Sequence, residues 1–342
     1  MTKKNLSLWS IITITAIVIG CGFKLFTIYL TPYFNKKFTN YNYTYPKTNE
    51  RLIVAVEPYD AVIPELMLNV IKLAFYDREV VVDNNQSPHF IVRFEHVKKY
   101  NELKHWNAPY VTISGERWSI KRHKYRSNGP PIAEFVSALP KKTRELYFPF
   151  MLWCGVYPER KYTAEKFKPR KFLAYISSNC VKTREQLFAL IKKLNPTAQS
   201  LGICSNNENV RYCGNLDEAY AQYNFGFAME NHQIPGYITE KIINVFRGGA
   251  IPIYWGDSVT VNKYFNPKAF IDVGKFKNLQ QAATYIVNLS EEQIQIMQQQ
   301  PIFKDNKIPE IFKINDNRNH QFLKQAAEFI RTEYFKVLMK YK

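Results

Sequence analysis

The sequence predicts an α/β protein with two doubly wound domains, each a parallel sheet between helices. Short apolar runs alternate with stretches of helical period along most of the chain, which is the pattern of βα units in a parallel sheet. The alternation is interrupted by the charged segment 160–171, which contains Pro169 and is typical of an interdomain linker. With 342 residues, the chain is long enough for two domains of ordinary size.

The N-terminal segment 6–30 is almost entirely apolar, with Lys24 as its single charged residue. A membrane-spanning helix needs about 20 such residues, and Lys24 is close enough to one end for its ammonium group to reach the interface. We therefore predict that residues 1–30 form a transmembrane signal anchor and that the globular part is lumenal. A cleaved signal peptide or a lipoprotein box at Cys21 is the alternative, which the continuing apolar run disfavours. Residues 31–50, rich in Asn, Thr, Tyr and Pro, are predicted to be a stem.

The first globular domain is predicted at residues 51–158. A helix is expected at residues 61–75, because apolar side chains recur there with helical period. Strands are expected at the short apolar runs 52–56, 80–82, 90–94 and 110–114. Strands and helices in this order predict parallel pairing.

The second domain is predicted at residues 159–318, followed by a helix within 319–342 that packs back across the two halves. The expected strands are residues 172–177, 200–204, 225–230, 250–255 and 269–273, and the expected helices are 183–194 and 237–247. Ligands of open parallel sheets bind beyond the carboxyl ends of the strands. We therefore expect the two domains to face each other across a ligand-binding cleft.

The formal net charge of +18 suits an anionic partner. The basic residues are spread along the chain and are densest at 121–126, 141–144 and 160–171, so a solvated lysine-rich surface is the simpler interpretation. No recognition helix, aromatic nucleic-acid motif or zinc-finger spacing accompanies the charge, and nucleic acid is therefore not an expected partner. An apolar content of 46% excludes a disordered protein.

Five cysteines are present, and their spacing fits no zinc pattern. Cys21 lies in the apolar N-terminal segment. The other four are Cys154, Cys180, Cys204 and Cys213. They either pair in an oxidising lumen, with Cys204 and Cys213 closing a short loop, or stay reduced, and the sequence leaves both possibilities open.

Residues 225–257 form the most informative segment. An apolar strand ends at Glu230, a turn through Pro235 and Gly236 follows, and the expected helix runs to a glycine pair of the kind that ends helices. The free N–H groups at the start of that helix suit a phosphate. Lys241 in the first turn opposes the helix dipole unless an anion lies nearby. Taken singly, these residues are more simply explained as an ordinary Glu–Lys pair at a helix start.

Taken together, the string resembles the signature of the α-1,3/1,4-fucosyltransferases, which runs Phe, Glu-Asn-Ser, Asp-Tyr-x-Thr-Glu-Lys and then a Pro-Val-x-x-Gly-like strand. The matching residues are Phe225, Glu230, Asn231, Tyr237, Thr239, Glu240, Lys241, Pro252 and Gly256. Two positions depart from the pattern: His232 replaces Ser, and Gly236 replaces Asp. These departures put details of the donor contacts in doubt.

The resemblance extends upstream. Residues 171–184 are similar to the family's strand and Ser-Asn segment, which is followed by an arginine, here Arg184. The Gly-Glu segment of the family's acceptor domain is matched at residues 114–116, and the end of that domain at residues 147–149. The similarity covers roughly residues 111–272.

The resemblance implies the GT-B fold, GDP-fucose as donor, a glycan acceptor and inversion at the sugar carbon, with an α-1,3 linkage expected. It implies that Glu116 is the general base and that Arg184 and Lys241 hold the diphosphate. The residues expected to position nucleotide, ribose or fucose are Asn231, Tyr237 and Glu240, with Ser177, Glu230 and Thr239 as further donor contacts. Glu116 is otherwise a strand-end carboxylate paired with a neighbouring arginine.

A metal requirement is not expected, and GDP-fucose is a substrate rather than a cofactor. Many glycosyltransferases hold their nucleotide through a metal bound by Asp-x-Asp, but no two aspartates here are two residues apart. A metal-free site neutralises the diphosphate with Arg, Lys and backbone N–H groups, which residues 225–257 and Arg184 provide.

Three other functions stay open. In the first alternative, an enzyme of the same fold transfers a different nucleotide-activated sugar. In the second, a non-catalytic basic module binds nucleic acid or a membrane surface with strong salt dependence. In the third, a lectin-like relative binds glycan and releases no GDP.

Overall fold

The structure is a computed structural model of the 342-residue chain, and it describes residues 50–57, 65–94, 106–114, 129–153, 158–162, 169–205, 215–312 and 320–340. The predicted anchor (1–30) and nearly all of the predicted stem (31–50) lie outside these ranges. Within them, no helix is long and apolar enough to cross a bilayer. Attachment to a membrane through the N-terminal segment therefore stays a prediction.

The first lobe is built on a six-stranded sheet. Its strands are β1 (Arg51–Glu57), β2 (Glu79–Val82), β3 (Phe90–Phe94), β4 (Tyr110–Ile113), β5 (Pro131–Val136) and β6 (Glu145–Tyr147). They lie in the order β2-β1-β3-β4-β5-β6, and each pairs in parallel with its neighbours. Helix α2 (Glu65–Ala74) packs on this sheet, and the short helix α3 (Phe150–Trp153) follows β6.

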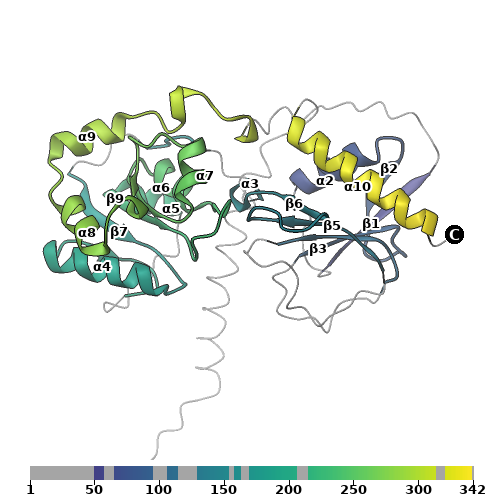
Figure 1. Ribbon diagram of the computed structural model, residues 1–342, viewed down its shortest axis with the longest axis horizontal. Coiled ribbons are helices and arrows are strands. Elements are labelled where there is room, and N and C mark those ends of the chain that lie inside the picture. Colours follow the sequence, from purple (N-terminus) through teal and green to yellow (C-terminus); the bar gives the residue numbers. More distant parts are fainter. Residues whose placement is uncertain are drawn as a thin grey trace, which may run out of the picture.

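The second lobe is built on a five-stranded sheet. Its strands are β7 (Lys171–Tyr175), β8 (Gln199–Ser200), β9 (Tyr223–Met229), β10 (Ile251–Trp255) and β11 (Ile271–Asp272). Their order is β11-β10-β9-β7-β8, again with parallel pairing throughout. Two parallel sheets with helices confirm the predicted α/β class, and Figure 1 shows the two lobes side by side.

Helices cover both faces of the second sheet. They are α4 (Lys182–Leu194), α5 (Leu216–Ala221), α6 (Lys241–Arg247), α7 (Ser258–Tyr264), α8 (Leu279–Val287) and α9 (Glu291–Gln299). Side chains of β9 alternate between the faces: Phe225 and Phe227 pack in the cluster that contains α4 and α8, whereas Ala228 packs in the cluster that contains α6. The second lobe is therefore doubly wound.

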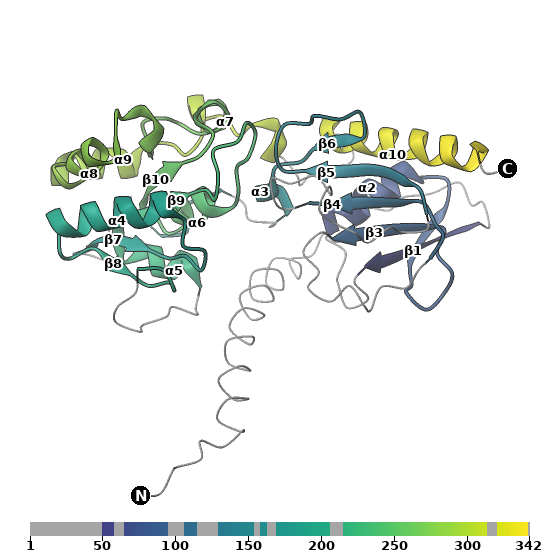
Figure 2. The same cartoon turned by 60° about the horizontal axis from the view of Figure 1, so that its bottom comes forward.

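Helix α10 (Gln321–Lys340) lies on the first lobe, as both Figure 1 and Figure 2 show. Its Arg331 donates two hydrogen bonds to the carboxylate of Asp77, at 2.8 and 3.1 Å, just beyond the end of α2. Tyr334 packs edge-on against Phe75, with ring centroids 4.9 Å apart. The chain thus returns from the second lobe to complete the core of the first.

The linker between the lobes is tied to the C-terminal end of α6. The Lys161 N–H donates to the carbonyl of Arg247 at 3.0 Å, and the Arg170 guanidinium donates to the carbonyl of Gly249 at 2.8 Å. These donors satisfy carbonyl groups that a helix leaves unpaired at its end. Gly249 has φ +72°, the left-handed conformation that ends many helices, as the sequence predicts.

A buried ion cluster lies beside this attachment. Asp217 on α5 and Arg247 on α6 are 4% and 1% exposed. The Asp217 Oδ2 atom lies 3.0 Å from the guanidinium of Arg247 and 2.9 Å from Nζ of Lys161. The positive charge of Arg247 on α6 is thus neutralised where α6 packs on α5.

Two predicted boundaries in the second lobe are wrong. The strand expected at residues 200–204 ends with β8, because the backbone at Gly202 lies against Ser177, where an added Cβ would come within 2.3 Å of backbone atoms. The chain turns there, and the Ile203 N–H donates to the carbonyl of Ser177 at 2.9 Å. The helix expected from residue 237 begins at Lys241.

Candidate functional site

The site lies at the carboxyl ends of three neighbouring strands. Ser177 follows β7, Glu230 follows β9 and Asp257 follows β10. These strands pair in parallel, so the residues that follow them meet at one edge of the sheet. Most of the predicted donor-site residues lie at this edge.

Arg184 on α4 is the central cation of the site. It is 2% exposed. Its guanidinium donates to the Ser177 hydroxyl at 3.0 Å, the Asn179 carbonyl at 2.9 Å and the Asn231 amide oxygen at 2.8 Å. The structure therefore brings Asn231 next to Arg184 and Ser177, two predicted donor-site residues that lie far from it in the sequence.

The charged guanidinium of Arg184 donates its hydrogen bonds in the described structure to neutral acceptors only. Within the described residues, no carboxylate forms an ion pair with it, and its Nε–H has no acceptor. Burial lowers the pKa of Arg184, although the group stays a cation because an arginine starts far above neutral pH. A buried cation without a charged partner is unfavourable, and an anion beside it relieves that cost. The arrangement suits a phosphate, which arginine binds through two parallel hydrogen bonds.

Lys241 provides the second cation, and Glu230 holds it. The Lys241 Nζ atom lies 3.1 Å from Oε2 of Glu230 and 2.9 Å from the hydroxyl of Thr239. Burial lowers the pKa of Lys241, but the carboxylates of Glu230 and Glu240 outweigh this effect and raise it overall. The side chain of Lys241 is 26% exposed, and its raised pKa keeps the ammonium group charged at neutral pH.

Glu230 also explains why the predicted helix start is wrong. Its fully buried carboxylate accepts hydrogen bonds from the Thr239 N–H and hydroxyl, each at 2.8 Å. These bonds hold residues 237–239 outside the helix, and Glu240 becomes the residue that caps α6. The predicted phosphate site on a long helix N-terminus is thereby corrected, because α6 has 7 residues and the cationic side chains are the stronger anion ligands.

Tyr237 lies in the turn before α6 and is 1% exposed. Its N–H donates to the carbonyl of Ile234 at 3.0 Å. Pro235 at the second position and Gly236 with φ +84° at the third make this a type II turn. The turn leads the chain from Asn231 through Tyr237 to the start of α6.

Glu116, the predicted base, lies outside the described residues. The described chain stops at Ser114, immediately after β4 in the first lobe, where the Ser114 carbonyl accepts a hydrogen bond from Ser137 at 3.0 Å. The role of Glu116 therefore stays a prediction.

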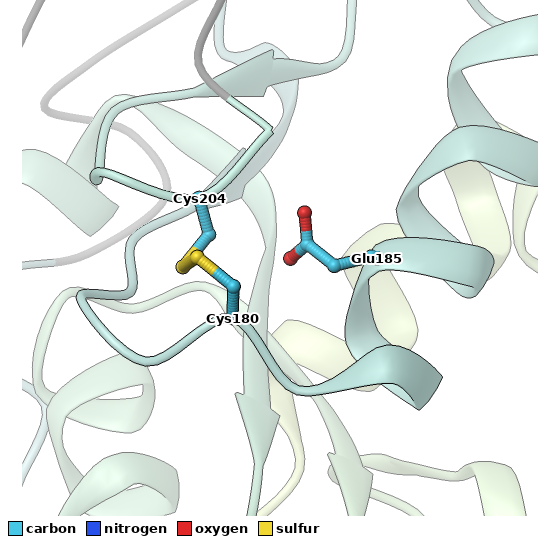
Figure 3. A group of neighbouring side chains, drawn as sticks. All are labelled: Cys180, Glu185 and Cys204. Atoms are coloured by element: carbon cyan, nitrogen blue, oxygen red, sulfur yellow. A yellow bond between two sulfur atoms is a disulfide. The ribbon is translucent and has the colours of Figure 1, made fainter.

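A disulfide joins Cys180 and Cys204, whose Cα atoms are 5.1 Å apart (Figure 3). The suggested pairing of Cys204 with Cys213 is wrong, and Cys213 lies outside the described residues together with Cys154. Cys180 and Cys204 follow the paired strands β7 and β8, so their proximity results from the sheet topology. The sequence signal, a cysteine shortly after each of two strands, becomes useful only when the strand order is known.

The disulfide fixes the loop that holds Arg184, because Cys180 directly follows Asn179, one of its acceptors. Glu185 lies next to the two sulfur atoms and accepts hydrogen bonds from the hydroxyls of Tyr175 and Ser205. Across the described ranges, Cys180, Glu185 and Cys204 are the one group of three close ligand atoms that suits a metal ion. Its two sulfur atoms are bonded to each other, which leaves a single carboxylate, so the group does not fit a metal in this state.

Reduction of this disulfide is expected to lower the free energy of unfolding by about 3 kcal/mol, because the bond closes a loop with a sequence separation of 24. Urea unfolding with and without reductant measures the difference. The Cys180→Ser variant is the control: it should unfold like the reduced wild type and should not respond to reductant. An equal midpoint for oxidised and reduced wild type would exclude the bond.

Comparison with known proteins identifies relatives of the second lobe. Residues 166–334 match the family described as glycosyltransferase family 10 (fucosyltransferase), C-terminal part. The matched segment is slightly less than half of the chain and contains the whole site of the second lobe, so the chain is similar to glycosyltransferase family 10, the fucosyltransferase family, over this part.

Among curated proteins, the chain is 37% identical over 119 residues to an α-(1,3)-fucosyltransferase of Helicobacter pylori, covering 34% of this chain and 24% of that protein. It is 32% identical over 191 residues to a putative fucosyltransferase of Acanthamoeba polyphaga mimivirus, covering 50% of this chain and 31% of that protein. A GDP-fucose protein O-fucosyltransferase 3 of Xenopus tropicalis is 26% identical over 210 residues, covering 58% of this chain and 42% of that protein. The chain thus spans less than half the length of each of these relatives.

Among solved structures, an α1,3-fucosyltransferase superposes with a TM-score of 0.61 at 21% identity, over 83% of this chain and 90% of that one. A structure of an α1,3-fucosyltransferase with GDP-fucose superposes with a TM-score of 0.57 at 20% identity, over 84% and 92%. At these identities the likeness concerns the fold.

Proposed function

We propose that the protein transfers fucose from GDP-fucose to a hydroxyl group of a glycan, with inversion at the sugar carbon and formation of an α-1,3 linkage. The observation that carries the proposal is the buried guanidinium of Arg184, which has no carboxylate partner in the described residues and lies at the edge that also holds Lys241. A nucleotide diphosphate supplies the missing negative charge. The match of residues 166–334 to the family described as glycosyltransferase family 10 (fucosyltransferase) makes GDP-fucose the favoured donor.

An inverting displacement has three requirements: a base that takes the acceptor proton, stabilisation of charge on the leaving diphosphate, and in-line placement of the anomeric carbon. Arg184 and Lys241 act on the diphosphate, whose negative charge grows as the glycosidic bond breaks. Because both cations are held in place before the donor arrives, they need little reorganisation during the reaction.

Two groups of residues support these cations. Ser177 orients Arg184, while Glu230 and Thr239 orient Lys241, so their role is to position the ligands of the diphosphate. Asn231, Tyr237 and Glu240 line the same edge and are proposed to contact nucleotide, ribose or fucose. No metal cofactor is needed in this scheme, since the diphosphate is neutralised by side chains.

Glu116 in the first lobe is proposed as the base. The Glu116→Gln variant is expected to lower kcat by about 10²- to 10⁴-fold, because an amide cannot accept the proton, and to leave KM for GDP-fucose unchanged. Steady-state GDP release measures both constants. Glu79→Gln, a carboxylate-to-amide change on β2 in the same lobe, is the control and should behave like the wild type. Near-normal turnover of Glu116→Gln would remove this residue from the base role.

The acceptor has a second candidate class. The relative named as a protein O-fucosyltransferase aligns over more of this chain than the α-(1,3)-fucosyltransferase does, 58% against 34%. This favours testing a Ser or Thr hydroxyl of a polypeptide beside a sugar hydroxyl. Anchoring through residues 1–30, with a lumenal catalytic part, is proposed together with either acceptor.

GDP release tests the proposed function. The full chain is incubated with GDP-fucose, other GDP-sugars or UDP-sugars, each with a glycan library, with a panel of polypeptides or with no acceptor, in buffer containing EDTA. We expect release from GDP-fucose that depends on an acceptor and persists in EDTA. Release from another sugar nucleotide alone would assign a different donor, and glycan binding without any release would identify a lectin-like protein.

A further inference from the structure

The two lobes touch at the type II turn formed by residues 234–237. Two hydrogen bonds from the first lobe reach its tip. The Leu139 N–H donates to the carbonyl of Pro235 at 2.9 Å, and the Tyr147 hydroxyl donates to the carbonyl of Gly236 at 2.8 Å. Leu139 follows β5 and Tyr147 ends β6, so the carboxyl edge of the first sheet reaches that of the second.

The second lobe holds the same turn from the other side. The Gly236 N–H donates to Oδ2 of Asp257 at 2.7 Å, and Asp257 also caps the start of α7. Both backbone polar groups of Gly236 are therefore paired, one within its own lobe and one with the first lobe. Removing the Tyr147 hydroxyl leaves a buried carbonyl without its partner.

No other residue fits well at position 236. Its φ of +84° is a conformation that residues with a side chain rarely adopt. A Cβ atom there would come within 2.8 Å of the Leu139 nitrogen and 3.0 Å of Cε2 of Tyr147. The departure from the usual Asp at this position therefore has a physical reason: glycine lets the first lobe approach the turn.

The turn carries residues of the donor site on both sides. Asn231, at its start, accepts the hydrogen bond from Arg184, and Tyr237 directly follows Gly236. The base of the loop is closed by Glu230 and Thr239. Among the described contacts, the tip is held by Asp257 of the second lobe and by Leu139 and Tyr147 of the first lobe, so its position depends in part on the hydrogen bonds from the first lobe.

We infer that Tyr147 is a positioning residue for the donor: its hydroxyl fixes the turn at Gly236 and thereby places Tyr237 and Asn231 against the GDP-sugar. The inference rests on the proposed function and adds a residue of the first lobe to the donor site. It also implies that a change in the spacing of the lobes changes donor affinity, because the turn moves with the contact.

The phenol of Tyr147 donates over the whole working pH range. Burial raises its pKa, and the nearby Tyr264 and Asp257 raise it further. The contact is therefore a permanent hydrogen bond, and its effect on donor affinity should not depend on pH between pH 6 and pH 9, the range of the assay, because that range already ends about one pH unit below an ordinary tyrosine pKa of about 10 and the pKa of Tyr147 is raised further.

The Tyr147→Phe variant tests the inference, with Tyr223→Phe as the matched control. Tyr223 is also buried, and its hydroxyl bonds Gln199 at the opposite, amino-terminal end of β9. For Tyr147→Phe we expect KM for GDP-fucose and Kd for GDP to rise about 5- to 30-fold, with kcat changed less than about twofold. Tyr223→Phe should leave KM and Kd unchanged while lowering the unfolding midpoint by a similar amount.

A double variant distinguishes the hydrogen bond from a general loss of structure. Gly236→Ala separates Tyr147 from the turn, so adding Tyr147→Phe to it should cause little further rise in KM. Full additivity of the two changes, or equal KM values for Tyr147→Phe and Tyr223→Phe, would overturn the inference. Titration with GDP alone keeps this test independent of the sugar: a wild type that binds GDP but releases none from GDP-fucose contradicts the proposed function only.

Discussion

Replacing Arg184 with methionine is expected to lower kcat/KM for GDP-fucose by about 10²- to 10³-fold, the effect of removing a preorganised donor to developing negative charge. Most of this loss should appear in binding of GDP as well, because the guanidinium contacts the diphosphate in the ground state. Steady-state GDP release and titration calorimetry with GDP measure the two effects.

The same variant is expected to unfold at the same or a higher urea concentration than the wild type. Arg184 is 2% exposed and has no carboxylate partner in the described structure, so its burial is unfavourable, and an apolar side chain of similar length avoids that cost. Loss of binding with retained stability is the pattern of a residue kept for function.

Lys182→Met is the matched control, since it removes one exposed positive charge from the same turn of α4. It should change kcat/KM less than about threefold, because an exposed charge is screened by solvent. Equal effects of Arg184→Met and Lys182→Met would show that net charge matters rather than the guanidinium.

Replacing Asp217 with alanine is expected to lower the free energy of unfolding by about 3–5 kcal/mol, because Arg247 stays buried without its close, buried carboxylate partner and keeps, among the described ion pairs, only the exposed Glu159 at 3.9 Å. The Asp217 Oδ2 atom lies within 3.0 Å of both the Nε and an Nη atom of Arg247 and 2.9 Å from Nζ of Lys161. Urea unfolding followed by tryptophan fluorescence measures the change.

Glu333→Ala is the control for this stability prediction. Glu333 pairs with Lys336 on the surface of α10, at 2.7 Å, and an exposed pair of this kind contributes about 0–1 kcal/mol. A loss for Asp217→Ala that is no greater than for Glu333→Ala would contradict a structural role of the buried cluster. Because Lys161 belongs to the linker and Arg247 to α6, Asp217→Ala should also loosen the attachment of the linker.

The strands of the first lobe illustrate what sequence pattern can predict. Residues 90–94, an apolar run interrupted by Arg93, are β3 as predicted. Strand β5 was not predicted, because it begins with a proline and contains Glu134, so its pattern is interrupted. Helices α8 and α9 were also missed: α9 is rich in glutamine and has few apolar residues for a clear stripe, whereas α8 is a short helix of 9 residues whose apolar stripe was overlooked.

The candidate site was predictable as a set of residues but not as a geometry. The motif identified Arg184, Asn231 and Lys241, yet nothing in the spacing indicates that the guanidinium bonds Asn231 or that Glu230 holds Lys241. Local pattern favours a helix from Tyr237, and the buried carboxylate of Glu230 overrides it. Such long-range polar contacts depend on strand order, which a single sequence does not provide.

The most direct test of the proposed donor site is a crystal structure of the full chain with GDP. We predict that diphosphate oxygens contact the guanidinium of Arg184 and the ammonium group of Lys241, with the nucleotide beside Asn231 and Tyr237. GDP bound away from the carboxyl ends of β7 and β9, or a diphosphate that touches neither cation, would contradict the proposed site.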